Sequence, residues 1–336
     1  MSEIEWLTEE FIQNALRNAK KDNSILIESA DLFGIEMTMM TSTLREMESV
    51  LKGTKLGGLC YFTRSENPKV LMIEDLAPLG FKMANRQTGL DFNHCMLALQ
   101  GLAKFHASSV WIIEKNPKLK EIYSKGMFEM DFPKDMSNFF VSGMKFLVKA
   151  AESWPELRDD CRKKIEKIAD VAYDKAGIAR KLDEKEFNVI NHGDFWVNNM
   201  MFKVDFQLCS YTTPALDLLY FLNSSASEEV LENHRNSLIE GYVKTLSETM
   251  TRIGCKTKAP GIEYFKKILA DKAIIGFVIA CAGLPILKLD KSKAQGLEEM
   301  MSNKEDFHLM AYNNEAYRKV IVPRLHEWDS QGLFDK

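Results

Sequence analysis

The stretch "VINHGDFWVNNMMFKVDFQL", residues 189–208, decides how the rest of the chain is interpreted. It places His192, Asp194, Asn199 and Asp205 between apolar residues of the kind that form buried strands. In one interpretation the acids and amides cap turns and the histidine is a satisfied core residue. A zinc site built from histidine and carboxylate is disfavoured, because no second histidine lies nearby in the sequence. The spacing of the four residues favours a different kind of site.

His192, Asp194 and Asn199 have the spacing H-x-D-x-x-x-x-N, which is that of the catalytic loop of kinases. Phosphoryl transfer needs a carboxylate that orients the attacking hydroxyl group and accepts its proton, and Asp194 fits this role. It also needs hard oxygen ligands for magnesium. Asn199 is one candidate ligand, and Asp205 in "VDFQ" stands where a second carboxylate is needed. The pattern therefore predicts a phosphotransferase site that holds magnesium.

The order of the predicted elements indicates an α+β fold. "LCYFTRSENPKVLMIEDL" (59–76) predicts a β-hairpin, preceded by an expected helix at 6–21, a strand at 24–34 and a helix at 35–51. Helical patterns follow at 90–111, 137–151, 157–180, 228–252, 261–287 and 314–326, interrupted by the strand region 189–208. A small mixed α/β part thus precedes a large, mainly helical part. Pro78 and Gly80 mark the expected hinge, and a cleft between two lobes is a natural ligand site.

Composition excludes several classes of protein. The chain has 336 residues, a net charge of −4 and a pI near 6.0, so it lacks the basic footprint of a protein that binds nucleic acid or anionic membranes. Six cysteines without CxxC spacing favour a reducing compartment. The start of the chain, "MSEIEWLTEE", does not resemble a signal peptide. The longest apolar run, residues 273–287, is shorter than a membrane span and predicts a buried helix. We therefore expect a cytoplasmic protein.

Five segments together carry a resemblance to a known family: "HGDFWVNNMMF", "VDFQ", "PALDLLYFL", "IEDLAPLGF" and "LAKFHASS". They resemble the insect ecdysteroid kinase-like family, which is related to choline kinases and aminoglycoside phosphotransferases. The likeness runs from Trp6 to "VPRLHEWDSQGLFD" at the end of the chain. It implies a two-lobed protein-kinase-like fold, with a small mixed α/β N-lobe (residues 1–75) and a large, mainly helical C-lobe (residues 76–336).

The resemblance also assigns roles to residues. Asp194 is implied to be the catalytic base, His192 a scaffold residue of the catalytic loop, and Asn199 and Asp205 the magnesium ligands. Asp217 in "PALDLL" is implied to brace the loop, although an acid at a helix N-terminus is nearly as good an interpretation. The nucleotide is expected to lie against the backbone of Met72, Ile73, Glu74, Asp75 and Leu76, and Glu36 stands where the helix glutamate of kinases is expected. His106 lies on the apolar face of its helix and is interpreted as a core residue.

Two parts of the kinase pattern are missing. No glycine-rich turn or strand lysine precedes Glu36, so the phosphate clamp has no candidate in the sequence. Only "MMFKV" separates Asn199 from Asp205, and it contains no turn residue, although both side chains must reach one metal ion. Two explanations stay open: the chain has lost both segments, or the sequence as written omits residues that the molecule carries.

Three hypotheses for the function follow. The leading one is an ATP-dependent kinase that phosphorylates a hydroxyl of a small, lipophilic alcohol such as an ecdysteroid. The alternative is a catalytically inactive, kinase-like binding or regulatory protein, because loss of the lysine and the phosphate loop removes transition-state stabilisation. A protein kinase is disfavoured, since "HGD" replaces "HRD" and no "APE"-like segment follows "VDFQ". The sequence indicates neither the acceptor nor the oligomeric state.

Overall fold

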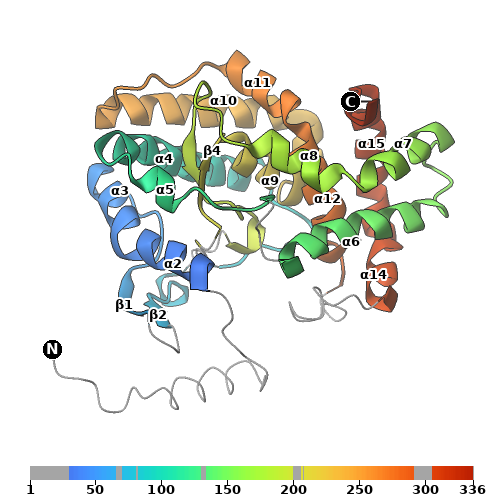
Figure 1. Cartoon of the computed structure of the whole chain (residues 1–336), viewed down its shortest axis with the longest axis horizontal. Coiled ribbons are helices and arrows are strands. Elements are labelled where there is room, and N and C mark those ends of the chain that lie inside the picture. The colour runs from blue at the N-terminus through green and yellow to red at the C-terminus, as the bar shows by residue number, and fades with distance from the viewer. Residues whose placement is uncertain are drawn as a thin grey trace, which may run out of the picture.

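The computed structural model describes residues 30–65, 70–80, 82–129, 134–199, 206, 208–290 and 305–335. Within these residues the protein is a helix-rich α/β structure with two small sheets (Figure 1). The predicted helix at 6–21 and the link at 200–205, which includes Asp205, lie outside the described residues. The mixed composition of helices and small sheets agrees with the α+β prediction.

The first described part contains two helices and a hairpin. Its elements are α2 (Ala30–Thr38), a π-helical turn (Met39–Thr43), α3 (Leu44–Val50), β1 (Cys60–Arg64) and β2 (Val70–Ile73). β1 and β2 pair antiparallel with Phe62 opposite Met72, which confirms the predicted hairpin. They lie beside α2 and α3 on one side of the molecule (Figure 1).

The strand predicted at 24–34 is wrong for residues 30–34, which belong to helix α2. Helix 35–51 is confirmed in outline, but with a π-helical turn in its middle. The hydroxyl groups of Thr38, Thr41 and Ser42 each donate to a carbonyl four residues earlier, and such bonds compete with the regular backbone ladder. The buried side chains of Met39, Met40, Leu44 and Met47 hold this helical run against the rest of the chain.

The larger part is built mainly from helices. These are α4 (Phe92–Lys115), α5 (Leu119–Ile122), α6 (Lys134–Ala151), α7 (Asp159–Ala169), α8 (Ala172–Arg180), α9 (Ala215–Ser224), α10 (Glu228–Ile253), α11 (Ile262–Asp271), α12 (Ala273–Leu287), α14 (Glu305–Tyr312) and α15 (Glu315–Ser330). Short 3-10 helices lie at Ala77–Leu79, Val197–Asn199 and Leu333–Asp335. α4 and α10 pack along each other, and both begin with a side-chain cap, from Asp91 and Ser227 respectively (Figure 1).

Two of the predicted long helices are each broken. Residues 157–180 form α7 and α8, and residues 261–287 form α11 and α12, which meet at an angle of 59°. Lys272 lies at the second break, where its ammonium group donates to the carbonyl oxygen of Ala179 at 2.8 Å and pairs with Glu186 at 3.1 Å. This buried lysine therefore ties the break to α8 and to the segment before β3.

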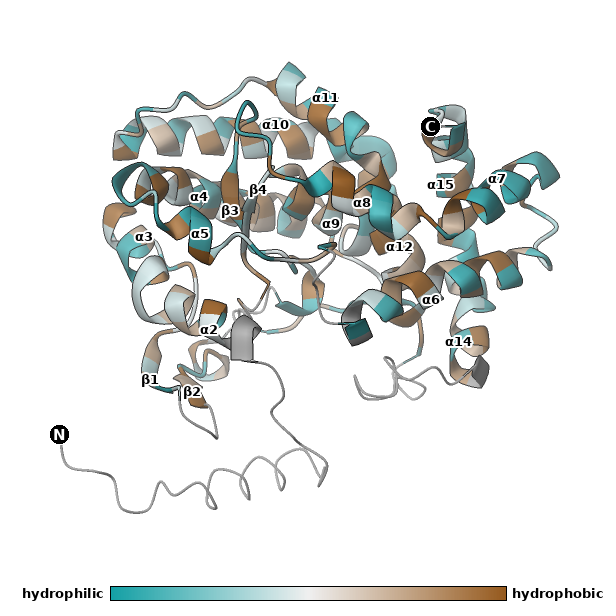
Figure 2. Cartoon of the chain, in the orientation of Figure 1, coloured by the Kyte–Doolittle hydropathy of each residue, from teal (hydrophilic) through white to brown (hydrophobic). Residues whose placement is uncertain are grey.

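Helix α12 is buried on nearly all sides, as predicted for residues 273–287 (Figure 2). No single helix within the described ranges has both the length and the apolar character for a membrane span, although the bent pair α11–α12 meets these two criteria when taken together.

The second sheet positions the site. β3 (Val189–Asn191) pairs antiparallel with β4 (Ser210–Thr212), so that Ile190 lies opposite Tyr211. Both strands are fully buried between the two hydrophobic clusters of the molecule. The larger cluster joins the helices, whereas the smaller one joins α2, α3 and β1 to α4, to β3 and to Phe206. Strand β3 therefore ends at Asn191, earlier than the predicted strand region, and His192, Asp194 and Asn199 follow it outside the strand.

Candidate active site

The segment 192–199 leaves strand β3 through a glycine turn. Gly193 has a φ of +84°, a left-handed conformation that L side chains rarely adopt. A Cβ atom at this position would lie 1.9 Å from the carbonyl oxygen of Leu208. Only glycine therefore fits, and the turn leads the chain from the buried strand to Asp194 and the 3-10 helix Val197–Asn199.

Asp217, in the first turn of α9, holds this turn by its backbone. Its side chain is fully buried. Oδ2 accepts a hydrogen bond from the backbone N–H of His192 at 2.7 Å, and Oδ1 accepts one from that of Gly193 at 2.8 Å. These bonds are those of a brace, as the sequence predicted, and Asp217 also occupies the favourable position of an acid in the first turn of a helix. The fold thus fixes the backbone immediately before Asp194.

His106 is buried in the core, as expected, but its ring links polar groups of two other helices. Nε2 lies 3.0 Å from Oδ2 of Asp217, and Nδ1 lies 2.7 Å from the hydroxyl of Tyr242 on α10. A neutral imidazole satisfies both contacts, because the Tyr242 hydroxyl donates to Nδ1 while Nε2–H donates to Asp217. Burial, followed by the nearby Asp217 carboxylate, raises the pKa of Tyr242 far above its usual value, so the phenol keeps its proton.

Asp194 and Asn199 are in direct contact. The side-chain N–H2 group of Asn199 donates to Oδ2 of Asp194 at 2.8 Å and to its backbone carbonyl oxygen at 3.0 Å. His192 turns its Nδ1 towards the backbone N–H of Asp194, at 3.3 Å. The three residues that the sequence grouped by spacing therefore meet in space, with the amide of Asn199 fixing the orientation of the Asp194 carboxylate.

Tyr220, three residues after Asp217 on α9, also reaches Asp194. Its hydroxyl hydrogen-bonds the Asp194 carboxylate, and burial together with this negative charge raises the pKa of Tyr220 far above its usual value. The phenol is therefore a proton donor at neutral pH. The carboxylate of Asp194 thus receives bonds from two sides, from Asn199 on its own loop and from Tyr220 on a helix.

Of the two predicted metal ligands the structure describes only Asn199, since Asp205 lies outside the described residues. Among the residues that the structure describes, no group of three or more His, Cys, Asp or Glu side chains could hold a metal ion. Because the amide nitrogen of Asn199 is engaged by Asp194, its oxygen Oδ1 is the atom left to serve as a ligand. Amide and carboxylate oxygens suit a hard cation such as Mg²⁺, so Asn199 has the chemistry of a ligand, and its role in binding magnesium stays a prediction.

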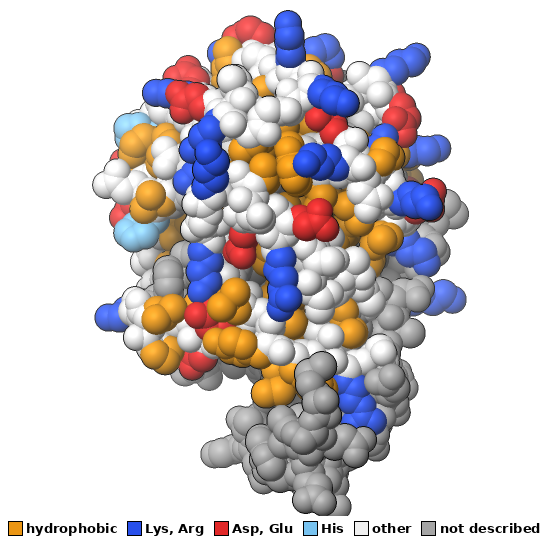
Figure 3. All heavy atoms as spheres, turned by 90° about the vertical axis from the view of Figure 1, so that its left-hand side faces the viewer, with side chains coloured by type: hydrophobic (Ala, Val, Ile, Leu, Met, Phe, Trp, Pro, Cys, Tyr) orange, Lys and Arg blue, Asp and Glu red, His pale blue; other side chains and the backbone are white. Residues whose placement is uncertain are grey.

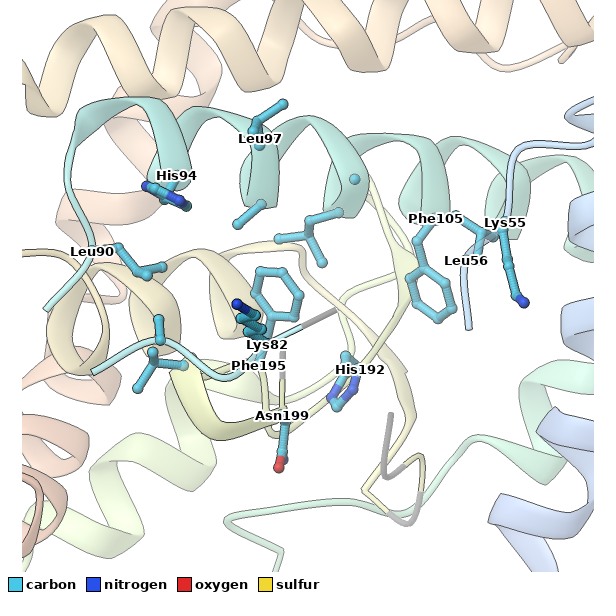
Figure 4. A pocket seen from close by; sticks show the side chains of 15 residues that line it. Lys55, Leu56, Lys82, Leu90, His94, Leu97, Phe105, His192, Phe195 and Asn199 are labelled. Carbon is cyan, nitrogen blue, oxygen red and sulfur yellow. The ribbon is translucent and has the colours of Figure 1, made fainter. Parts of the chain in front are cut away.

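A cavity of about 340 Å³ adjoins the catalytic loop (Figure 4). His192, Phe195 and Asn199 line it on one side. Helix α4 lines it on another with Ala98, Gly101, Leu102 and Phe105 among others, and Leu56, Ala84 and Leu90 complete an apolar wall. Lys55 and Lys82 lie at the cavity, whereas none of its described lining residues is acidic. The volume lies in the range of small-molecule sites.

The predicted nucleotide-binding residues are placed beside this cavity rather than in its lining. Met72 and Ile73 belong to β2. Glu74 accepts from Lys55 at 2.5 Å and from the backbone N–H of Leu59 at 3.0 Å, so that it connects the segment to a lysine that does line the cavity. Asp75 caps the 3-10 helix by accepting from the backbone N–H of Ala77, and Leu76 is buried.

Glu36 is buried on α2, where the helix glutamate was expected. Its carboxylate lies near the thiol of Cys60, whose pKa is raised, chiefly by burial, while Arg45 acts in the opposite direction. Glu36 does not line the cavity.

A sequence model of the ecdysteroid kinase-like family matches residues 9–255. The chain belongs to the ecdysteroid kinase-like family. No curated protein and no solved structure shows significant similarity to it. The matched range includes the catalytic loop, Asp217 and Tyr242, so the family's kinase-like character applies to the part of the chain that forms the site.

Four residues of this ecdysteroid kinase-like site escaped the sequence analysis: Tyr220, Tyr242, Lys55 and Lys82. The two tyrosines lie in helical patterns where an aromatic residue is ordinarily part of the core. Only the position of Tyr220, three residues after Asp217 in "DLLY", offered a signal, since residues three apart share one face of a helix. The two lysines lie in segments without regular structure, for which sequence patterns predict no direction.

Proposed function

We propose that this member of the ecdysteroid kinase-like family is an ATP-dependent kinase that transfers the γ-phosphoryl group to a hydroxyl of a small alcohol. The observation that carries the proposal is the arrangement around Asp194. Its carboxylate is oriented by Asn199 and Tyr220, and the backbone before it is fixed by the buried Asp217. A base held in one orientation is what phosphoryl transfer requires of the protein, because positioning supplies much of the catalysis.

Each residue of the loop then has a role. Asp194 accepts the proton of the attacking hydroxyl group, and Asn199 keeps the carboxylate turned towards it. His192 and Gly193 form the turn that Asp217 anchors. Asn199 Oδ1 and Asp205 would hold Mg²⁺, which neutralises charge on the phosphates of bound ATP.

Positive charge at the cavity supports a role in phosphate binding. Lys55 and Lys82 both line it and are the residues that we assign to the phosphates, in place of the lysine that the sequence lacks. Lys55 is held by Glu74, which belongs to the segment 72–76 where we propose that the adenine binds. In this proposal residues 1–75 form the nucleotide lobe and residues 76–336 form the lobe that carries the base.

The acceptor is proposed to be lipophilic, such as an ecdysteroid. The support is the apolar wall of the cavity, which helix α4 and Phe195 form next to the catalytic loop. An alcohol with an apolar body would bury its rings against this wall while its hydroxyl group reaches Asp194. The cavity and the base then act on the same molecule.

The test is transfer of labelled γ-phosphate from Mg·ATP to ecdysone by protein of verified mass. Asp194→Asn should lower the rate constant for transfer by about 10²–10⁴-fold, because the general base is lost while the shape is kept. Asp174→Asn, at an exposed aspartate on α8, is the matched control and should leave the rate unchanged. Binding of Mg·ATP without transfer to any alcohol would instead support the inactive, kinase-like binding protein.

A further inference from the structure

Gly101 stands in the interior of the 24-residue helix α4, where glycine is unfavourable. A glycine there lowers helix stability relative to alanine, because it costs more backbone entropy. Packing explains other helical glycines: a Cβ at Gly241 would lie 2.3 Å from Sδ of Met96, and one at Gly276 would lie 2.4 Å from Nδ2 of Asn223. At Gly101 an added Cβ would meet no atom within 4 Å. No neighbouring side chain therefore requires a glycine at this position.

The cavity supplies the missing reason. His94, Ala98, Gly101 and Phe105 all line it, and their spacing of four, three and four residues places them along one face of α4. Gly101 thus lies between Ala98 and Phe105 in the part of α4 that lines the cavity. The space that a side chain at Gly101 would enter is space that a bound molecule can use.

We infer that Gly101 is a specificity-determining position, which lets an uncharged, planar ring system lie directly against the backbone of α4. Because Gly101 has no Cβ atom, the surface of the helix is flat between Ala98 and Phe105, and we call this surface the step. Rings can approach the step more closely than they can approach a branched side chain. Phe105 and Phe195 provide aromatic surface beside this step. The inference rests on the proposed function in that the rings belong to a substrate, either the nucleobase of ATP or the apolar body of the alcohol.

Gly283 shows why the inference needs two observations, the open space at the glycine and its place in the cavity lining. It lies within α12, and a Cβ there would also meet no atom within 4 Å, yet it does not line the cavity. Open space alone therefore does not mark a ligand site. The same contrast makes Gly283→Leu the matched control, since it adds an identical side chain to a helical glycine elsewhere.

The experiment measures binding of three probes to the full chain by calorimetry or fluorescence: Mg·ATP, ecdysone, and 1-naphthol as an uncharged, planar ring system. Gly101→Leu should weaken at least one probe tenfold or more, whereas Gly283→Leu should leave all three unchanged. Gly101→Ala serves as the second variant. It should raise Tm by about 2 °C, because alanine favours the helix, while weakening the same probe several-fold.

The pattern of losses identifies the ligand. If Gly101→Leu weakens binding of Mg·ATP alone, the nucleobase occupies the surface at Gly101. If it weakens binding of ecdysone, the acceptor occupies that surface. Both results support the inference. Binding of all three probes to Gly101→Leu as tightly as to the unchanged protein overturns it, and so does a lack of binding by the unchanged protein. Because these measurements need no turnover, a protein that discriminates the probes but transfers no phosphate refutes the proposed function and leaves the inference standing.

Discussion

The catalytic loop 192–199 and the segment 72–76 are held by the fold in different ways. The loop follows a buried strand, and a fully buried carboxylate binds two of its backbone N–H groups. The segment 72–76 continues a two-stranded hairpin, and Met72 in it is 41% exposed. Tyr61 on the paired strand is 65% exposed, and Figure 3 shows hydrophobic side chains at the surface on this side of the molecule.

This difference indicates which part of the site the fold holds in place before any ligand binds. Helices α4, α9 and α10 meet through His106, Asp217 and Tyr242, and this buried contact fixes the part of the site that would carry the proton transfer. The nucleotide side depends instead on partly exposed contacts such as the ion pair of Lys55 with Glu74. Substitutions at the first region should therefore cost much more stability than substitutions at the second.

The largest effect is expected for Asp217→Asn. The amide keeps one acceptor oxygen but turns an NH2 group towards donors, so that at least one buried N–H loses its partner. The free energy of unfolding should fall by about 3 kcal/mol, as measured by urea denaturation, and transfer should fall with it. Asp271→Asn, at an exposed aspartate of α11, is the control. A loss below about 1 kcal/mol for Asp217→Asn would contradict the brace.

A smaller effect is expected for Tyr242→Phe. The change removes only the hydroxyl that meets Nδ1 of His106, and a buried group left without its partner costs about 1–2 kcal/mol. Tyr123→Phe is a matched control, because it removes a buried hydroxyl that bonds Thr43, outside the chain of contacts to the loop. Both variants should lose similar stability in urea, but only Tyr242→Phe should also lower kcat. Equal kcat values for the two would show that Tyr242 is purely structural.

The smallest effect on stability is expected for Lys55→Met, and it should depend on pH. The hydrogen bond from Lys55, followed by that from the Leu59 N–H, lowers the pKa of Glu74. A carboxylate with a lowered pKa in the folded state adds stability above its ordinary pKa of about 4.3, and this stability is lost as the pH falls through the lowered value. The Tm of Lys55→Met should therefore be slightly below that of the unchanged protein at pH 7, and this difference should vanish on acidification. A difference that is the same at pH 7 and pH 3 would argue against the pair.

Part of the site was predictable because it is local in sequence. Asp194 and Asn199 lie five residues apart on one loop, so their spacing assigned them to one site, and the structure brings their side chains into contact. The hairpin at 59–76 was predictable for the same reason, since its turn and both strands are contiguous. The family match over residues 9–255 confirms the resemblance that these motifs indicated.

Other features depend on contacts between distant segments. At the break between α11 and α12, the buried Lys272 reaches the carbonyl of Ala179, far away in the sequence. The link from Tyr242 through His106 to Asp217 joins three helices, and no periodicity within one of them predicts it. The wrong strand at 30–34 has a local cause, because a short apolar run fits a strand and a helix equally well.

The turn at Gly193 has a consequence for mutational scanning. Since the Leu208 carbonyl oxygen fills the place of any side chain, a library of variants selected for folded protein should retain only glycine at this position. The same selection for folded protein should accept many residues at position 194, because replacing Asp194 leaves the turn intact. These variants should disappear only when the selection also requires turnover. The two adjacent positions therefore form an internal calibration, with one reporting on folding and the other on chemistry.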